Sequence, residues 1–96
     1  MSDICVLGNF VADNSFYAKQ LPAKGQTIFG TGYQLGPGGK GSNQAIAASR
    51  LNSKVSFLGK VGDDEYGKMA IELYKKNNLN YKTVFVSKEH PTGVAG

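Results

Sequence analysis

The stretch from Gly36 to Gln44 constrains the fold of this chain more than any other. It reads GPGGKGSNQ, with four glycines in its first six residues, and runs into the helix-forming sequence AIAASRL. Glycine has no Cβ, so such a turn can bring its backbone against a ligand. We expect a helix from about residue 42 to 51, whose start offers free N–H groups and the positive end of the helix dipole. With Lys40 and Asn43 as further donors, the turn predicts a site for a small polar molecule rich in hydroxyls or negative charge.

Size and charge limit the classes of partner. The 96 residues suffice for at most one small domain. The net charge of +4 comes from scattered lysines without a basic, aromatic-rich cluster, so nucleic acid is not an expected partner. No basic leader and no apolar run of membrane length is present, so we expect a cytoplasmic protein without membrane contact. Cys5 is the single cysteine and lies in an apolar run, which predicts a buried, reduced thiol.

The pattern of apolar residues predicts an α/β fold. Short apolar runs at residues 4–7, 55–61 and 81–86 are typical of strands, and the first, ended by Gly8, suits a strand buried on both faces. Asp63 and Asp64 are candidate N-caps for a second helix. Its buried stripe is expected to comprise Tyr66, Met69, Ala70, Leu73 and Tyr74. These elements predict a mostly parallel sheet flanked by helices.

Residues 14–35 break this pattern. A turn is expected at residues 22–25, and residues 27–35 alternate like a strand with one covered face. The matching arm is expected near residues 15–19. We therefore predict a β-excursion inserted between the first parallel strand and the glycine turn. The final residues, 91–96, read as a turn and the opening of another strand, so we expect the N-terminal portion of a longer protein.

Two glycine motifs compete for the turn. Gly36, Gly38 and Gly41 have the G-x-G-x-x-G spacing of a dinucleotide fingerprint, but the segment before them alternates and Pro37 removes a donor. A Walker-type phosphate loop would need glycine at position 34 and Ser or Thr after Lys40, and the chain has neither. A hydroxyl-binding turn remains, opposite Asp13, whose carboxylate can accept two hydrogen bonds. The alternative is that Asp13 caps a turn and Asn43 caps the helix.

The turn and its surroundings resemble the ribokinase-like (PfkB) carbohydrate kinases, and ribokinases among them most closely. The resemblance rests on the run from Gly38 to Ala45, on Asp13 five residues after Gly8, and on the turn at residues 22–25. Two further matches are VGDD at residues 61–64 with Gly67, and TGVA at residues 92–95. The resemblance covers essentially all of the chain. It implies a small β-sheet lid, formed by residues 14–35 and 91–96, over an α/β sheet.

The resemblance implies that the γ-phosphoryl group of ATP is transferred to a primary hydroxyl of a pentose, with Mg²⁺ as a cofactor. The sugar-binding residues implied are Val11, Ala12, Asp13, Gly39, Lys40, Gly41, Ser42 and Asn43. Lys40 is also implied to approach the transferred phosphate, and the lid to form a homodimer contact. ATP and Mg²⁺ would bind mainly outside residues 1–96.

The chain departs from the family pattern in two ways. Ribokinases carry asparagine where this chain has Val11, and an apolar residue there resembles deoxyribokinase-like members. This departure predicts either a sugar that lacks a hydroxyl or another furanose. The glycine-rich motif that holds the family's catalytic base is absent, and neither Asp63, Asp64 nor His90 is expected to replace it. We expect residues 1–96 alone to be inactive and to hold no metal. The rival interpretations are a non-catalytic sugar-binding module and a dinucleotide-binding oxidoreductase fragment.

Overall fold

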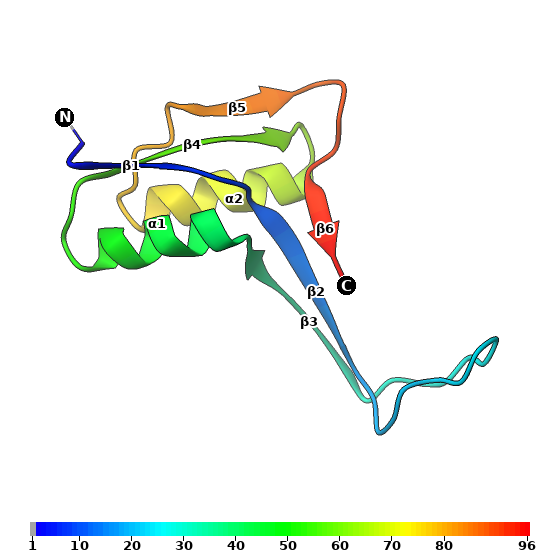
Figure 1. Cartoon of the computed structure of the whole chain (residues 1–96). Coiled ribbons are helices and arrows are strands. Elements are labelled where there is room, and N and C mark those ends of the chain that lie inside the picture. The colour runs from blue at the N-terminus through cyan, green and yellow to red at the C-terminus, as the bar shows by residue number, and fades with distance from the viewer. Residues whose placement is uncertain (1) are drawn as a thin grey trace.

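The computed structural model describes residues 2–96 and divides them between two sheets (Figure 1). The elements follow in the order β1 (Ile4–Leu7), β2 (Val11–Tyr17), β3 (Gly32–Gly38), α1 (Lys40–Arg50), β4 (Val55–Gly62), α2 (Glu65–Lys76), β5 (Val84–Ser87) and β6 (Gly93–Ala95). Strands β1-β4-β5 form a parallel sheet, and β3-β2-β6 form a small sheet. Among the described residues no helix combines the length and apolar character that a membrane crossing requires.

The parallel sheet carries both helices on one face (Figure 1). Strand β4 lies in the middle and turns Val55, Phe57 and Val61 towards the helices, where all three are buried. Helix α2 places Tyr74 fully inside this core, with its ring 5.1 Å from that of Phe57. The predicted stripe of α2 is confirmed: Ala70 and Tyr74 are fully buried, and Tyr66, Met69 and Leu73 pack half-buried against the core.

One buried hydrogen bond joins the two helices. The hydroxyls of Ser42 and Tyr74 lie 2.8 Å apart, and neither residue is exposed to solvent. Burial raises the pKa of the Tyr74 hydroxyl, so the group stays neutral and available for this bond. A hydroxyl in an apolar core is tolerated only with such a partner.

Strand β1 differs from its prediction. It is exposed along much of its length, and Cys5 is exposed rather than buried. Val6 lies in register with Phe57 and faces the helices, so Cys5 and Leu7 face the opposite side of the sheet. No helix among residues 2–96 covers that side, and Leu7 is 78% exposed. An apolar run identifies a strand, but it does not show which of its two faces is covered.

The small sheet confirms the β-excursion and moves its boundaries. Strands β2 and β3 pair antiparallel from Val11 opposite Gly38 to Tyr17 opposite Gly32. The predicted strand at residues 27–35 therefore begins only at Gly32 and continues through Gly38. The turn at residues 22–25 is confirmed by a bond from the Gln26 N–H to the Ala23 carbonyl (2.9 Å). Residues 18–31 extend from the body as an arm (Figure 1), because the ladder stops at Tyr17.

Strand β6 returns from the far end of the chain to the same sheet. It pairs parallel with β2, with Gly93 opposite Val11 and Ala95 opposite Asp13. This confirms that residues 91–96 resume the β-excursion. Strand β5 was also predicted, although it begins at Val84 instead of residue 81.

Both helix starts are set by particular residues. Helix α2 is capped by Asp64, whose carboxylate accepts a hydrogen bond from the Gly67 N–H at 2.8 Å, so one of the two predicted caps is confirmed. Helix α1 begins at Lys40, two residues earlier than predicted, after Gly39. Gly39 has φ +95°, and a Cβ at this position would lie 2.1 Å from the Asn9 carbonyl oxygen. Only glycine fits where β3 turns into α1 against the end of β1.

We therefore predict that Gly39→Ala destabilises the protein by at least about 2 kcal/mol, because alanine meets both an unfavourable φ and the Asn9 backbone. Chemical denaturation of the complete gene product measures this loss. Gly36→Ala is the matched control, since nothing lies within 4 Å of its Cβ position and its φ is not positive. Equal stability of the two variants would contradict the close approach at Gly39.

Candidate functional site

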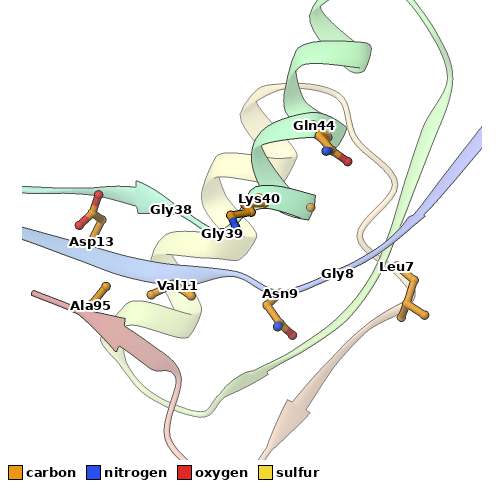
Figure 2. Close-up of a pocket in the computed structure, with 11 residues that line it drawn as sticks. Leu7, Gly8, Asn9, Val11, Asp13, Gly38, Gly39, Lys40, Gln44 and Ala95 are labelled. Atoms are coloured by element: carbon orange, nitrogen blue, oxygen red, sulfur yellow. The ribbon is translucent and has the colours of Figure 1, made fainter.

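A pocket of about 580 Å³ lies where the end of β1 meets the small sheet and the start of α1 (Figure 2). A groove along β5 is as large, so volume does not single this pocket out. Its distinction is that residues of four strands and one helix, together with the links between β1 and β2 and between β3 and α1, converge on it. It is lined by Leu7, Gly8, Asn9, Val11, Asp13, Gly38, Gly39, Lys40, Gly41, Gln44 and Ala95.

The alternation of β2 aims its odd-numbered side chains at the pocket. Phe10 and Ala12 are buried in the protein, whereas Val11 and Asp13 line the pocket. Asn9, in the link before β2, also lines it (Figure 2). The pocket therefore receives an amide, an apolar group and a carboxylate in a row.

We call the surface that β2 and its neighbouring strands present to the pocket the pocket floor. The two strands beside β2 contribute almost no side chains to it. Val11 lies between Gly38 of β3 and Gly93 of β6, so neither neighbour has a side chain. Asp13 lies between Gly36 and Ala95, which adds one methyl group. A ligand on this surface would meet backbone together with the side chains of Val11 and Asp13.

The start of α1 forms the opposite wall. Gly39, Lys40 and Gly41 all line the pocket, and Gln44 follows Lys40 by one helical turn. Among residues 2–96 no side chain caps this helix. Its first N–H groups have no partner within the helix, and they carry the positive end of the helix dipole. Together with the Lys40 ammonium group, this wall favours hydroxyl or anionic oxygen atoms.

The two charged side chains of the pocket do not neutralise each other. The one salt bridge among the described residues joins Lys68 to Glu65 on the surface of α2. Asp13 and Lys40 both remain exposed. A carboxylate acceptor on one side and cationic donors on the other suit a neutral polyhydroxyl compound that meets an anionic group at one end.

The structure brings together five of the eight predicted site residues. Val11, Asp13, Gly39, Lys40 and Gly41 line the pocket. Ala12, Ser42 and Asn43 do not: Ala12 is fully buried, and Ser42 faces the core, where it bonds to Tyr74. Asn43 is exposed in the first turn of α1, outside the lining.

Neither capping alternative describes these residues. Asp13 lies within β2 rather than at a turn, and the N-cap of α1 is Gly39 rather than Asn43. The dinucleotide fingerprint also fails, because Gly36 and Gly38 lie in the antiparallel strand β3. That fingerprint needs a parallel strand leading directly into its glycine turn.

Sequence reasoning missed four side chains that line the pocket: Leu7, Asn9, Gln44 and Ala95. Three of them had a signal. Leu7 is the last residue of the predicted first strand. Asn9 follows the carboxyl end of a parallel strand, where α/β sheets bind ligands, and Gln44 shares a helix face with Lys40. Ala95 had none, because its place depends on the pairing of β6 with β2.

Known proteins have sequences and folds similar to those of this chain. Residues 1–96 match the sequence profile of the pfkB family carbohydrate kinases. The chain is 44% identical to the ribokinase of Bacillus subtilis (strain 168) over 79 residues, which are 82% of this chain and 27% of that protein. It is 42% identical to the deoxyribokinase of Salmonella typhi over 86 residues, which are 90% of this chain and 28% of that protein.

A solved structure with the same fold is that of Arabidopsis thaliana ribokinase complexed with ribose and ATP. It superposes with a TM-score of 0.86 and 32% identity over 97% of this chain and 30% of that one. The 96 residues thus span somewhat under a third of the length of these relatives. The match over all residues, together with this identity and shared fold, shows that the chain belongs to the pfkB family of carbohydrate kinases and has the ribokinase-like α/β fold.

Proposed function

We propose that the complete protein transfers the γ-phosphoryl group of ATP to a primary hydroxyl of a pentose, either ribose or deoxyribose. The observation that carries this proposal is the convergence of Asp13, Val11 and the Gly39–Gly41 turn on one pocket, in a chain of the pfkB family. Ribokinase and deoxyribokinase relatives both support a pentose. Residues 1–96 supply the sugar-binding half of this site.

Asp13 would hold the sugar from the small sheet. Its carboxylate can accept hydrogen bonds from two neighbouring hydroxyls, and its row is otherwise occupied by Gly36 and Ala95. The first turn of α1 would hold the sugar from the other side through free N–H groups. Asn43 lies one turn after Gly39, so a sugar seated over this turn would bring a further hydroxyl towards its amide.

Lys40 would interact with the negatively charged phosphoryl group that is transferred. The attacking hydroxyl oxygen forms a bond to the γ-phosphorus while the bond to the β-phosphate oxygen breaks, and the hydroxyl proton leaves to a base. The Lys40 ammonium group and the α1 dipole are suited to attract the transferred group. A pocket closed by the small sheet would also exclude water as a competing acceptor.

ATP and Mg²⁺ would bind mainly outside residues 1–96. Residues 2–96 contain no group of three or more His, Cys, Asp or Glu that could hold a metal ion. No described side chain is placed as the base for the attacking hydroxyl. We therefore expect residues 1–96 alone to transfer no phosphate. Mg²⁺ bound with ATP would supply neutralisation of the phosphate charges.

The proposal predicts that the complete gene product releases ADP from ATP when given a pentose. Asp13→Ala should lower kcat/KM for the sugar by about 100-fold or more, because two hydrogen bonds to a charged group are lost. Asp63→Ala is the control, since Asp63 is exposed and lies outside the pocket. Sugar binding without ADP release would instead favour the second candidate, a non-catalytic sugar-binding module of the same fold.

Val11 would select a sugar that lacks one hydroxyl. Its side chain stands between two glycines and cannot hydrogen-bond. A hydroxyl over Val11 would lose its water without gaining a partner, whereas a CH₂ group would pack favourably. The proposal that the sugar is deoxyribose rests on this packing of a CH₂ group against Val11.

We predict that Val11→Asn raises kcat/KM for ribose relative to deoxyribose by about tenfold, because the amide gives the extra hydroxyl a partner. Steady-state kinetics with both sugars measure the ratio. Val86→Asn makes the same change in β5, where Val86 is 52% exposed and outside the pocket, and should leave the ratio unchanged. An unchanged or weaker use of ribose by Val11→Asn would refute this selection.

The face of the small sheet that points away from the pocket would form a homodimer contact. Phe16 lies opposite Tyr33 in the ladder, and their ring centroids are 5.2 Å apart. Leu35 and Val94 share this face by alternation, and all four side chains are exposed. Clustered exposed apolar side chains of this kind mark protein contacts.

We predict that the complete gene product is a dimer and that Phe16→Glu converts it to a monomer, because a buried carboxylate would lack a partner. Size-exclusion chromatography with light scattering measures the mass. Leu51→Glu places the same charge on an equally exposed leucine at the end of α1 and should leave the dimer intact. A monomeric wild type, or a Phe16→Glu variant that stays dimeric, would refute the contact.

A further inference from the structure

We propose that Asp64 is a positioning residue for the sugar pocket: by holding Thr92, it fixes where strand β6 enters the pocket floor. This inference rests on the proposed function. It concerns a side chain outside the pocket, at the start of α2, whose cap role accounts for only part of its bonding.

The carboxylate of Asp64 is bonded to both polar groups of Thr92. Its Oδ2 accepts a hydrogen bond from the Thr92 N–H at 2.9 Å, and its Oδ1 accepts one from the Thr92 hydroxyl at 2.7 Å. The same Oδ1 accepts the capping bond from Gly67. These bonds, those to Thr92 above all, hold the pKa of Asp64 below its usual value, so the group is ionised at neutral pH.

Thr92 is in turn fixed to the end of β4. Its hydroxyl oxygen accepts a hydrogen bond from the Gly62 N–H at 2.8 Å, and the residue is 5% exposed. A Cβ on Gly62 would lie 2.5 Å from the Thr92 nitrogen, so the approach depends on glycine. We call Asp64, Thr92 and Gly62 the β6 anchor. It ties one point of the chain to both β4 and α2.

The anchor matters because β6 is short and, beyond its strand pairing, is held by one long side-chain hydrogen bond, from the Asn14 amide to the Ala95 carbonyl at 3.3 Å. The link from β3 to α1 is packed against Asn9, and β2 pairs with β3 along seven residues. Strand β6, by contrast, joins the small sheet through three residue pairs that begin immediately after Thr92. The place of Thr92 therefore sets the register of the strand.

Register decides what the pocket contacts. With Gly93 opposite Val11 and Ala95 opposite Asp13, the pocket face of β6 carries one hydrogen atom and one methyl group. A slip by one residue would turn every side chain of β6 to the other face and bring Val94 into the floor. Even a smaller displacement would move Ala95, which lines the pocket.

A substitution can separate the cap from the anchor. Asparagine caps helices about as well as aspartate. It has only one oxygen, however, and its NH₂ group would face a donor either at Thr92 or at Gly67. The orientation with the oxygen at the Oδ1 position retains the bonds from the Gly67 N–H and the Thr92 hydroxyl, whereas the reverse orientation retains only the bond from the Thr92 N–H. We therefore expect Asp64→Asn to keep α2 capped and to lose the bond from the Thr92 N–H.

The test uses the complete gene product with ATP and a pentose. Asp64→Asn and Thr92→Val should each raise KM for the sugar about tenfold and leave KM for ATP unchanged, because β6 lines the proposed sugar pocket, whereas ATP is proposed to bind mainly outside residues 1–96. Thr92→Ser keeps the hydroxyl and should behave like wild type. Leu79→Ala, a buried position outside the anchor, controls for loss of stability and should leave KM for the sugar unchanged.

Hydrogen–deuterium exchange of the peptide that holds residues 93–95 is measured in the same variants. Faster exchange there than in β4, for Asp64→Asn and Thr92→Val alone, supports the proposal. Unchanged exchange overturns it, and so does faster exchange with an unchanged sugar KM, which would make the anchor merely structural. If wild type phosphorylates no sugar, the proposed function fails separately. A crystal structure of Asp64→Asn then decides: displacement of Ala95 from Asp13 supports the positioning role, and an unmoved β6 refutes it.

Discussion

The backbone contact between the end of β1 and the start of α1 determines the geometry of everything around the pocket. A Cβ on Gly8 would lie 2.9 Å from the Gly41 Cα, and one on Gly39 would lie 2.1 Å from the Asn9 carbonyl. These distances leave no room for side chains between the two segments. The helix start is thereby pressed onto the carboxyl end of a parallel strand. Its free N–H groups therefore lie at the same pocket as Asn9 and Val11.

The bareness of the pocket follows from the same use of small residues. The neighbours of Val11 are glycines and those of Asp13 are a glycine and an alanine, so within the small sheet these two side chains, next to Asn9, give the pocket its chemical character. A single apolar group next to a single carboxylate can distinguish ligands by one oxygen atom. A floor crowded with side chains would spread that discrimination over many weaker contacts.

The sequence predicts the kinds of elements here better than their limits. The alternation and stripe patterns identify the strands and the buried face of α2, because those patterns report local geometry. They do not show that the glycines at 36 and 38 continue a strand, since that depends on β2 lying alongside. They also misplace Cys5, because the covering of a sheet face is decided by distant parts of the chain.

The same limit applies to the site. Asp13, Lys40 and the glycine turn could be found from residue types and spacing, whereas Ser42 could not be assigned to the core without Tyr74, which lies 32 residues further along the chain. The contribution of β6 was even less accessible, since Ala95 and Asp13 meet only through strand pairing.

The arrangement of the two sheets around the pocket also determines which elements a bound ligand would connect. Asp13 belongs to the small sheet, whereas Lys40 belongs to a helix packed on the parallel sheet. A sugar bonded to both would bridge the two sheets and add contacts to those at Asn9 and at Thr92. Part of the binding free energy would then fix the small sheet in place, which is what the proposed phosphoryl transfer would require if the pocket is to exclude water.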